Sequence, residues 1–215
     1  MKQKIILSAL ILSAAASLGL APNARAQSTM ATPPVETPAG LGLLGQTYAG
    51  LAYSYVHLDT SPVSADRYSF EYNQPLNAGF DAVFNYDRTQ DGLLAGDRGY
   101  GQSFDAALRA FSTAYTWGKP YVEAGIGYDR TKYSGHRDDS FAWIAGAGIE
   151  FQATAALSVT PYIRYTRTDG LPDHNTADYG VKANYWLTKQ WAVTGGISLD
   201  DSRNLSYKLG VNVHF

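Results

Sequence analysis

Hydrophobic and polar residues alternate with a period of two along most of the chain from Thr47 onward. In the last eleven residues, LSYKLGVNVHF, every odd-numbered position is apolar or aromatic, and Ser, Lys, Gly, Asn and His fill the even-numbered positions. A period of two predicts a β-strand with one apolar face. Ten segments show the pattern: 47–58, 67–73, 78–87, 102–111, 121–131, 140–152, 157–167, 176–185, 191–200 and 205–215.

The segments and their connections together predict a membrane-spanning barrel. A strand of about ten tilted residues crosses the hydrocarbon of a bilayer. Tight connections (74–77, 118–120, 153–156, 188–190) alternate with longer ones rich in Asp, Gly, Pro and Ser (58–66, 88–101, 132–139, 168–175). Short turns at one end and longer loops at the other are typical of transmembrane β-barrels. We therefore expect an all-β protein, a closed antiparallel transmembrane β-barrel of ten strands. The short connection 201–204 leaves eight strands as the alternative.

The two faces of the segments differ in a way that favours this barrel over a soluble β-sandwich. Aromatic residues gather near segment ends, as they do at membrane interfaces. These residues are Tyr48, Tyr72, Tyr86, Tyr128, Trp143, Phe151, Tyr185 and Trp191. The polar face mixes glycines with charged residues, which suits a crowded lumen better than a solvated surface.

Charged residues of the polar face are the candidate lumen residues. They are Glu71, Asp81, Asp105, Arg109, Glu123, Glu150, Arg164, Asp178, Lys182 and Lys208. Because a narrow lumen excludes water, we expect these charges to pair across strands, and the turn at 112–120 brings Arg109 near Glu123. We favour a salt-bridged lumen that holds the barrel shut. A charged constriction that selects ions or small solutes is the alternative.

The end of the chain carries a known assembly pattern. Lys208, Gly210, Val213 and Phe215 follow the order polar-x-Gly-x-x-hydrophobic-x-aromatic-end. This resembles the C-terminal signal of bacterial outer-membrane β-barrels, and the chain as a whole resembles small porin-like or OmpA-like barrels. The resemblance implies that the barrel assembly machinery binds the last strand, that lipopolysaccharide and other outer-membrane lipids surround the barrel, and that it is monomeric.

Before the barrel, the sequence predicts two further regions. Residues 1–26 are typical of a cleaved signal peptide: Lys2 and Lys4 precede an apolar stretch, and Ala24-Arg25-Ala26 fits a cleavage site. Residues 27–46 are rich in proline, without aromatics, and indicate a periplasmic leader, although LGLLGQ before Thr47 is a candidate start of the ordered region. We expect residues 47–215 to form the barrel, in the cell outer membrane.

Charge and composition exclude several functions. Without the three basic residues of the signal, 14 Lys and Arg face 19 Asp and Glu, a net charge of −5. This balance argues against nucleic-acid binding, which needs a basic face. The chain has no cysteine, and no sequence motif indicates a metal or another cofactor.

Some loop residues offer weak candidates for catalysis or metal binding. Asp138-Asp139 and Asp173-His174 could orient a water, as in outer-membrane proteases, and Ser134 with His136 could serve a lipid A deacylase. The set Asp87, Asp91 and Asp97 lacks EF-hand spacing. Because Asp, His and Gly are common in solvated loops, we expect a protein that is not an enzyme, with an outer-membrane hydrolase as a minor alternative.

The assembly signal gives the first testable prediction. Deletion of Phe215 or the substitution Phe215→Asp should leave export and signal cleavage intact but impair outer-membrane insertion, because the terminal aromatic is lost. Heat-modifiable mobility of the membrane fraction on gels measures insertion. Wild-type amounts of heat-modifiable barrel in both variants would contradict the assignment.

Overall fold

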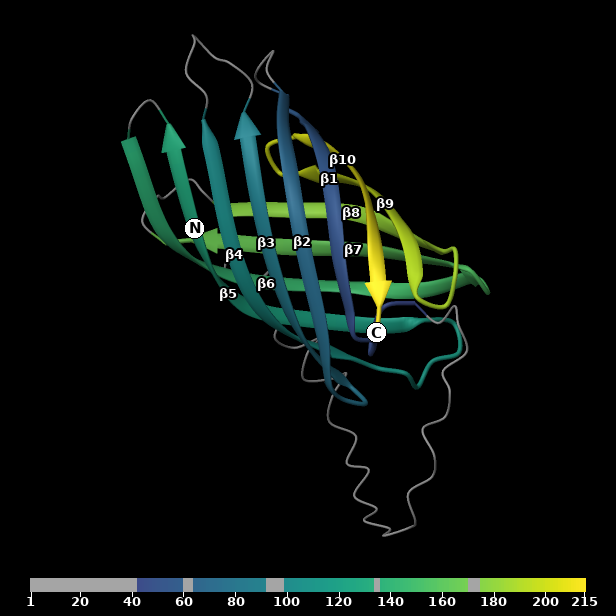
Figure 1. Ribbon diagram of the computed structural model, residues 1–215. Helices are drawn as coiled ribbons and strands as arrows, with labels where there is room; N and C mark the ends of the chain where they lie inside the picture. Colours follow the sequence, from purple (N-terminus) through teal and green to yellow (C-terminus); the bar gives the residue numbers. More distant parts are fainter. Residues whose placement is uncertain (1–41, 60–63, 92–98, 134–135, 170–174) are drawn as a thin grey trace.

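A computed structural model describes residues 42–59, 64–91, 99–133, 136–169 and 175–215 as one closed, ten-stranded antiparallel barrel (Figure 1). The strands are β1 (Tyr48–His57), β2 (Ser64–Asn77), β3 (Phe80–Asp91), β4 (Tyr100–Phe111), β5 (Lys119–Tyr133), β6 (His136–Thr154), β7 (Leu157–Thr168), β8 (Asn175–Trp186), β9 (Trp191–Asp200) and β10 (Leu205–His214). The prediction of a ten-stranded barrel is confirmed, and the alternative of eight strands is wrong.

The first and last strands close the barrel. β1 and β10 pair antiparallel without a register shift, from Tyr48 opposite His214 to His57 opposite Leu205. The amide of Phe215 continues the ladder by donating to the carbonyl of Thr47 at 3.1 Å. Every strand therefore has two neighbours, and no strand edge is left with unpaired backbone groups.

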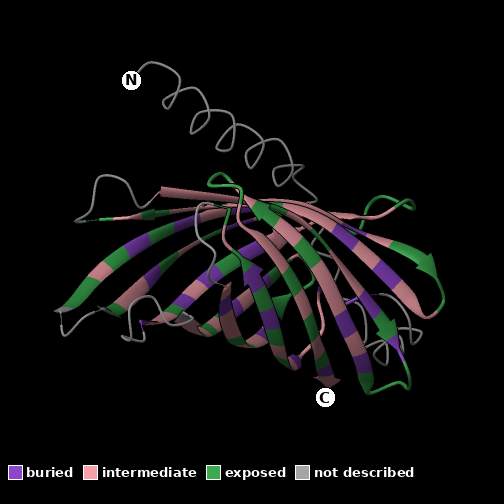
Figure 2. Ribbon diagram, turned by 90° about the horizontal axis from the view of Figure 1, so that it is seen from above, coloured by how far each residue is buried: buried purple, intermediate pink, exposed green. Residues whose placement is uncertain are grey.

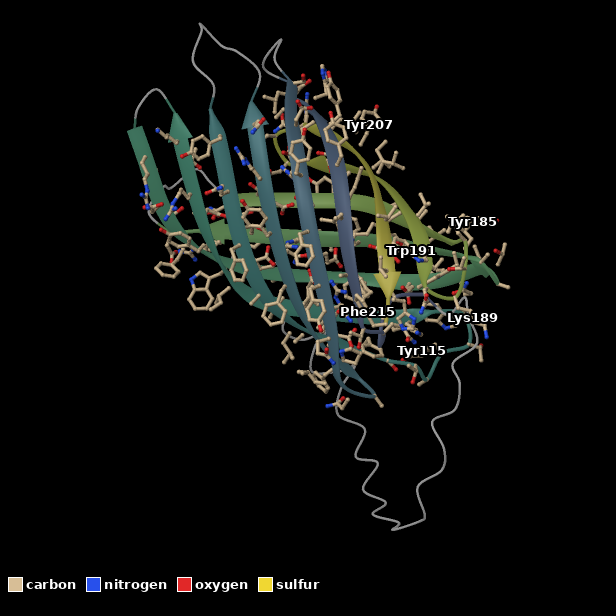
Figure 3. The ribbon with its side chains drawn as sticks, in the orientation of Figure 1. Tyr115, Tyr185, Lys189, Trp191, Tyr207 and Phe215 are labelled. Carbon is tan, nitrogen blue, oxygen red and sulfur yellow. The ribbon has the colours of Figure 1, made fainter. Side chains whose placement is uncertain are left out.

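The two ends of the barrel differ. The turn end carries the start of β1, the end of β10 and the connections 78–79, 112–118, 155–156 and 187–190. The loop end carries the connections 58–63, 92–99, 134–135, 169–174 and 201–204. Figure 3 places Tyr115, Tyr185, Trp191 and Phe215 toward the turn end and Tyr207 toward the opposite end.

Several strands are longer than the alternating segments predict. β5 and β6 pair from Lys119 opposite Glu150 to Tyr133 opposite His136, so most of the expected loop 132–139 belongs to a long hairpin. The apolar alternation stops earlier than the backbone ladder, because hydrogen bonds between strands need no apolar side chain. The segment boundaries therefore mark the apolar band, while the strands extend beyond it.

Burial alternates along the strands, as Figure 2 shows by its colours. In β1, Leu51 is 62% exposed on the outward face, whereas Ser54 is 4% exposed on the inward face. Large apolar residues thus cover the outside, and polar residues fill the lumen. Tyr48 is an exception to the prediction of interfacial aromatics: it is only 2% exposed and faces inward, because it has the same parity as Ser54.

Inward glycines make room for large side chains of the neighbouring strand. A Cβ atom at Gly148 would lie 2.7 Å from the ring of Tyr121, its partner in register on β5. A Cβ atom at Gly146 would lie 2.9 Å from Glu123, the next inward partner on the same strand. Such distances are below van der Waals contact, so both positions need glycine.

We expect the substitution Gly148→Val to destabilise the barrel by about 1–3 kcal/mol, because the new side chain would overlap Tyr121. Urea unfolding of the protein refolded in lipid vesicles measures this free energy. The matched control is Gly195→Val, since a Cβ atom at Gly195 meets only the carbonyl oxygen of Lys208, at 3.9 Å. Equal loss of stability in both variants would contradict the packing argument.

Candidate functional site: the barrel lumen

All ten charged residues expected in the lumen lie on inward-facing positions of the described strands. Five of them are buried: Asp81, Asp105, Arg109, Glu123 and Glu150. The half-buried members are Glu71, Arg164, Asp178, Lys182 and Lys208. The buried members concentrate toward the turn end, where the lumen is filled.

Arg109 and Glu123 form a buried ion pair between neighbouring strands. Nε and Nη2 of Arg109 both donate to Oε2 of Glu123, at 2.9 and 2.8 Å. The guanidinium also lies over the ring of Tyr121, 5.0 Å from its centroid. This is the contact that the β4–β5 hairpin predicts, because the two residues are opposite each other in register.

Two further ion pairs cross the lumen between strands that are not neighbours. Arg164 on β7 contacts Asp105 on β4 at 2.7 Å, and Lys182 on β8 contacts Glu71 on β2 at 3.3 Å. The hydroxyl of Tyr48 also donates to Glu71. These contacts link opposite walls, so the middle of the lumen is crossed by side chains.

Three of the ten charges have no counter-ion within ion-pair distance among the described residues: Asp81, Asp178 and Lys208. Asp81 accepts a hydrogen bond from the amide of Gly45 instead. Asp178 lies opposite Arg164 in register, but the guanidinium of Arg164 is turned toward Asp105. Lys208 lies opposite Gly196 and lines the same cavity as Lys182 and Glu71. Asp178 and Lys208 therefore border the open part of the lumen.

Residues 42–47 enter the turn end of the barrel and form what we term the N-terminal plug. Gly42, Leu43 and Leu44 are buried, and Leu43 packs with Tyr48, Trp186 and Ala192. The amide of Gln46 donates to the carbonyl of Leu43 at 3.2 Å, which closes a tight turn. Among the described residues, 42–46 therefore pack with the barrel although they precede Thr47.

Buried carboxylates hold the backbone of the plug. Glu150 accepts from the amides of Leu43 and Leu44, at 2.6 and 3.4 Å. Asp81 accepts from the amide of Gly45 at 2.9 Å, and Nζ of Lys119 donates to the carbonyl of Leu44 at 3.0 Å. Hydrogen bonds from amides to ionised carboxylates are stronger than neutral ones.

Two glycines allow the plug to approach these carboxylates. Gly42 and Gly45 have φ angles of 79° and 80°, a left-handed conformation that glycine adopts without steric penalty. The carboxylate of Glu150 occupies the space where a Cβ atom of Gly42 would lie. The sequence LGLLGQ therefore carries the signal for this turn, but the partners of its amides are distant in sequence.

Above the plug, the lumen contains a cavity of about 520 Å³. It reaches from Tyr121 and Lys182 to the loop end, where Thr89, Thr131 and Asp138 line it. Hydroxyl and charged side chains predominate in this lining. The volume lies in the range of small-molecule binding sites, about 300–1,000 Å³, but those sites are mostly apolar.

The four residues of the predicted assembly signal occupy both faces of β10. The exposed residues Leu209 and Val211 show that odd-numbered positions of β10 face outward. Val213 and Phe215 therefore face outward, and Lys208 and Gly210 face the lumen. Phe215 is 72% exposed at the turn end. The signal therefore presents its two apolar side chains on the outside of the closing strand.

Asp138-Asp139 is the one candidate catalytic pair whose two side chains the structure describes. Asp138 and Asp139 are adjacent in β6 and face opposite sides, and Asp139 is bound by Arg130 and Arg137 at 2.9 and 2.7 Å. Asp173, His174, Ser134 and Asp97 lie outside the described residues. In the described part of the chain, no three His, Cys, Asp or Glu side chains are grouped to hold a metal ion.

Comparison with known proteins shows the fold. The NanC porin matches with a TM-score of 0.51 and 9% identity, over 78% of this chain and all of that chain. The chain has the fold of bacterial outer-membrane β-barrel proteins. No protein-family model and no curated protein sequence matches it. No helix in the described residues is long and apolar enough to cross a membrane.

Two other solved outer-membrane proteins resemble the barrel more loosely. The translocator domain of the autotransporter NalP from Neisseria meningitidis is 12% identical over 79% of this chain and 88% of that chain, with a TM-score of 0.46. Ail of Yersinia pestis is 14% identical over 79% and 97% of the two chains, with a TM-score of 0.38.

The buried ion pair of Arg109 and Glu123 gives a prediction about the stability of the barrel. Arg109→Met or Glu123→Leu alone should destabilise the barrel by about 3–5 kcal/mol, because each leaves a buried charge unpaired. The double variant should lose less than the sum of the two. Urea unfolding in lipid vesicles completes the double-mutant cycle.

The exposed pair Arg167 and Asp169, 3.8 Å apart, is the control for this cycle. Its coupling should be about 0–1 kcal/mol. Additive losses at Arg109 and Glu123 would show that the buried pair is not coupled.

Proposed function

We propose that the protein is an integral outer-membrane barrel that acts at the cell surface without conducting solutes. We place the turn end of the barrel in the periplasm and its loop end at the cell surface. Outward-facing apolar residues such as Leu51, Ile126 and Leu209, each more than 55% exposed, support it, because water would not favour so much exposed apolar surface. The short connections of the turn end agree with the periplasmic side of such barrels.

The proposal that the barrel does not conduct rests on the N-terminal plug. Its amides are bound by Glu150 and Asp81, and its Leu43 is buried against Tyr48 and Trp186. Beside the plug, the pair Arg109 and Glu123 fills the adjacent lumen. A path for ions would have to displace buried apolar groups and satisfied charged groups together, which is unfavourable.

The role at the surface rests on the other end of the barrel. The cavity of about 520 Å³ reaches the loop end, where β1, β3, β5, β7 and β9 end. A barrel closed on one side and hollow on the other suits a structural or surface-interaction role, in which loops and cavity rim form the contact surface.

A narrow diffusion channel is the second candidate, and the polar lining of the cavity favours it. Lys208 and Asp178 border the cavity without a counter-ion among the described residues. If the plug left the turn end, such charges could guide ions toward the remaining lumen. The two candidates therefore differ in whether residues 42–47 stay in place.

Planar-bilayer recordings test the proposal. The mature wild-type protein should give no stable current steps. Deletion of residues 27–46 should produce discrete openings, and the double variant Asp81→Asn/Glu150→Gln should open more often than wild type, because the plug amides lose their charged acceptors. Asp138→Asn, at the loop end, is the matched control and should remain silent.

Stable steps from the wild-type protein, equal to those of the deletion variant, would overturn the proposal and favour the channel. Silence of every variant would show that the ion pairs close the lumen without the plug, and the non-conducting role would stand.

A further inference from the structure

Five aromatic side chains on the outer surface lie in one row across neighbouring strands. Phe70 on β2 is opposite Tyr86, Tyr86 opposite Phe104, Phe104 opposite Tyr128, and Tyr128 opposite Phe141 on β6. The rings of Tyr128 and Phe141 are 5.7 Å apart and edge to face. Aromatic residues mark the border between hydrocarbon and headgroups, and all five residues of this aromatic row lie in the loop-end half of their strands.

Basic side chains follow directly beyond the aromatic row, toward the loop end. Arg88 and Arg130 are two residues beyond Tyr86 and Tyr128 on the same outward face, about 7 Å farther along their strands. Lys132 lies another two residues out. These positions lie near the loop ends of their strands, which face the headgroups of the outer leaflet in the membrane orientation proposed above, on which the present inference rests.

Among the described strands, the outward basic side chains beyond the apolar band lie on only four neighbouring or near-neighbouring strands. The outward positions of β3, β5, β6 and β7 beyond the apolar band carry Arg or Lys, at Arg88, Arg130, Lys132, Arg137 and Arg167. We term these five residues the basic belt. The outward positions of the strands β8, β9, β10, β1 and β2 contain no Arg or Lys.

The basic belt contains more positive charge than its own acids neutralise. Asp139 is shared by two guanidiniums: Arg130 Nε lies 2.9 Å and Arg137 Nη2 2.7 Å from it. Lys132 is directly opposite Arg137, and like charges in this position destabilise a sheet. Neither Lys132 nor Arg88 forms an ion pair with another described residue. An anion from outside would relieve this repulsion.

We propose that the basic belt binds the phosphate groups of a phosphorylated glycolipid headgroup in the outer leaflet. Arginine forks bind phosphate oxygens bidentately, and the aromatic row lies where the acyl chains of the same lipid would begin. The rim between β5 and β6 supplies Arg130, Lys132 and Arg137, and Arg88 and Arg167 flank it on β3 and β7. The protein therefore has a preferred lipid-binding side.

Lipid retention tests the site. Wild-type barrel in phosphatidylcholine vesicles containing one tenth diphosphorylated lipid A is extracted in mild detergent, and native mass spectrometry counts the lipids bound. Wild type should retain diphosphorylated lipid A and little of the dephosphorylated form. The variant Arg130→Gln/Lys132→Gln/Arg137→Gln should retain at least tenfold less, because each basic residue near a membrane surface contributes severalfold to anion binding.

The control variant is Lys189→Gln/Arg203→Gln, which removes two exposed cations outside the basic belt: Lys189 at the turn end (Figure 3) and Arg203 in the β9–β10 connection. It should retain lipid A as wild type does. Heat-modifiable mobility, read first for each variant, shows that the barrel is folded and inserted. Should the triple variant not fold, loss of wild-type retention at high salt provides the same test.

Equal retention of both lipid forms by inserted wild-type protein would overturn the site and leave the membrane proposal standing. Failure of wild type to insert would overturn both. If the triple variant lost binding of a soluble sulfated polysaccharide but kept its lipid A, the basic belt would serve a soluble polyanion, and the lipid proposal would be wrong.

Discussion

Pairing of β1 with β10 is the interaction on which the rest of the structure depends. In the apolar interior of a bilayer, an unpaired backbone amide or carbonyl is costly, so a sheet is viable there only as a closed ring. Once the ring is closed, the alternation of side chains divides every strand into an outer apolar face and an inner polar one. The contents of the lumen follow from this division, because the inward residues have little water to solvate them.

The lumen satisfies its charges in two different ways. In the middle, Arg164 and Lys182 meet carboxylates from the opposite wall. At the turn end, Glu150 and Asp81 are bound instead by amides of the chain's own residues 43–45. The N-terminal plug thus donates hydrogen bonds to two buried carboxylates, and the carboxylates in turn hold the plug.

The sequence predicts contacts between neighbouring strands better than contacts across the lumen. Arg109 and Glu123 could be paired in advance, because a hairpin sets their register. The contacts of Arg164 with Asp105 and of Lys182 with Glu71 depend on the width and stagger of the closed barrel, which no local pattern states. The inward position of Tyr48 was missed for a similar reason: an aromatic at a strand end suits an interface as well as a packed lumen, and only its parity with Ser54 separates the two.

The outside of the barrel shows how much information register adds to periodicity. Alternation alone assigns Arg88, Arg130 and Arg137 to outward positions, but it does not say that they are neighbours in space. The ladders of β3 to β6 bring them together on consecutive strands, beyond one register row of aromatic rings. Since the remaining strands have no outward cation, the surface is asymmetric about the barrel axis. A uniform bilayer would impose no such asymmetry, whereas the proposed phosphorylated glycolipid, bound on this side of the barrel, accounts for it.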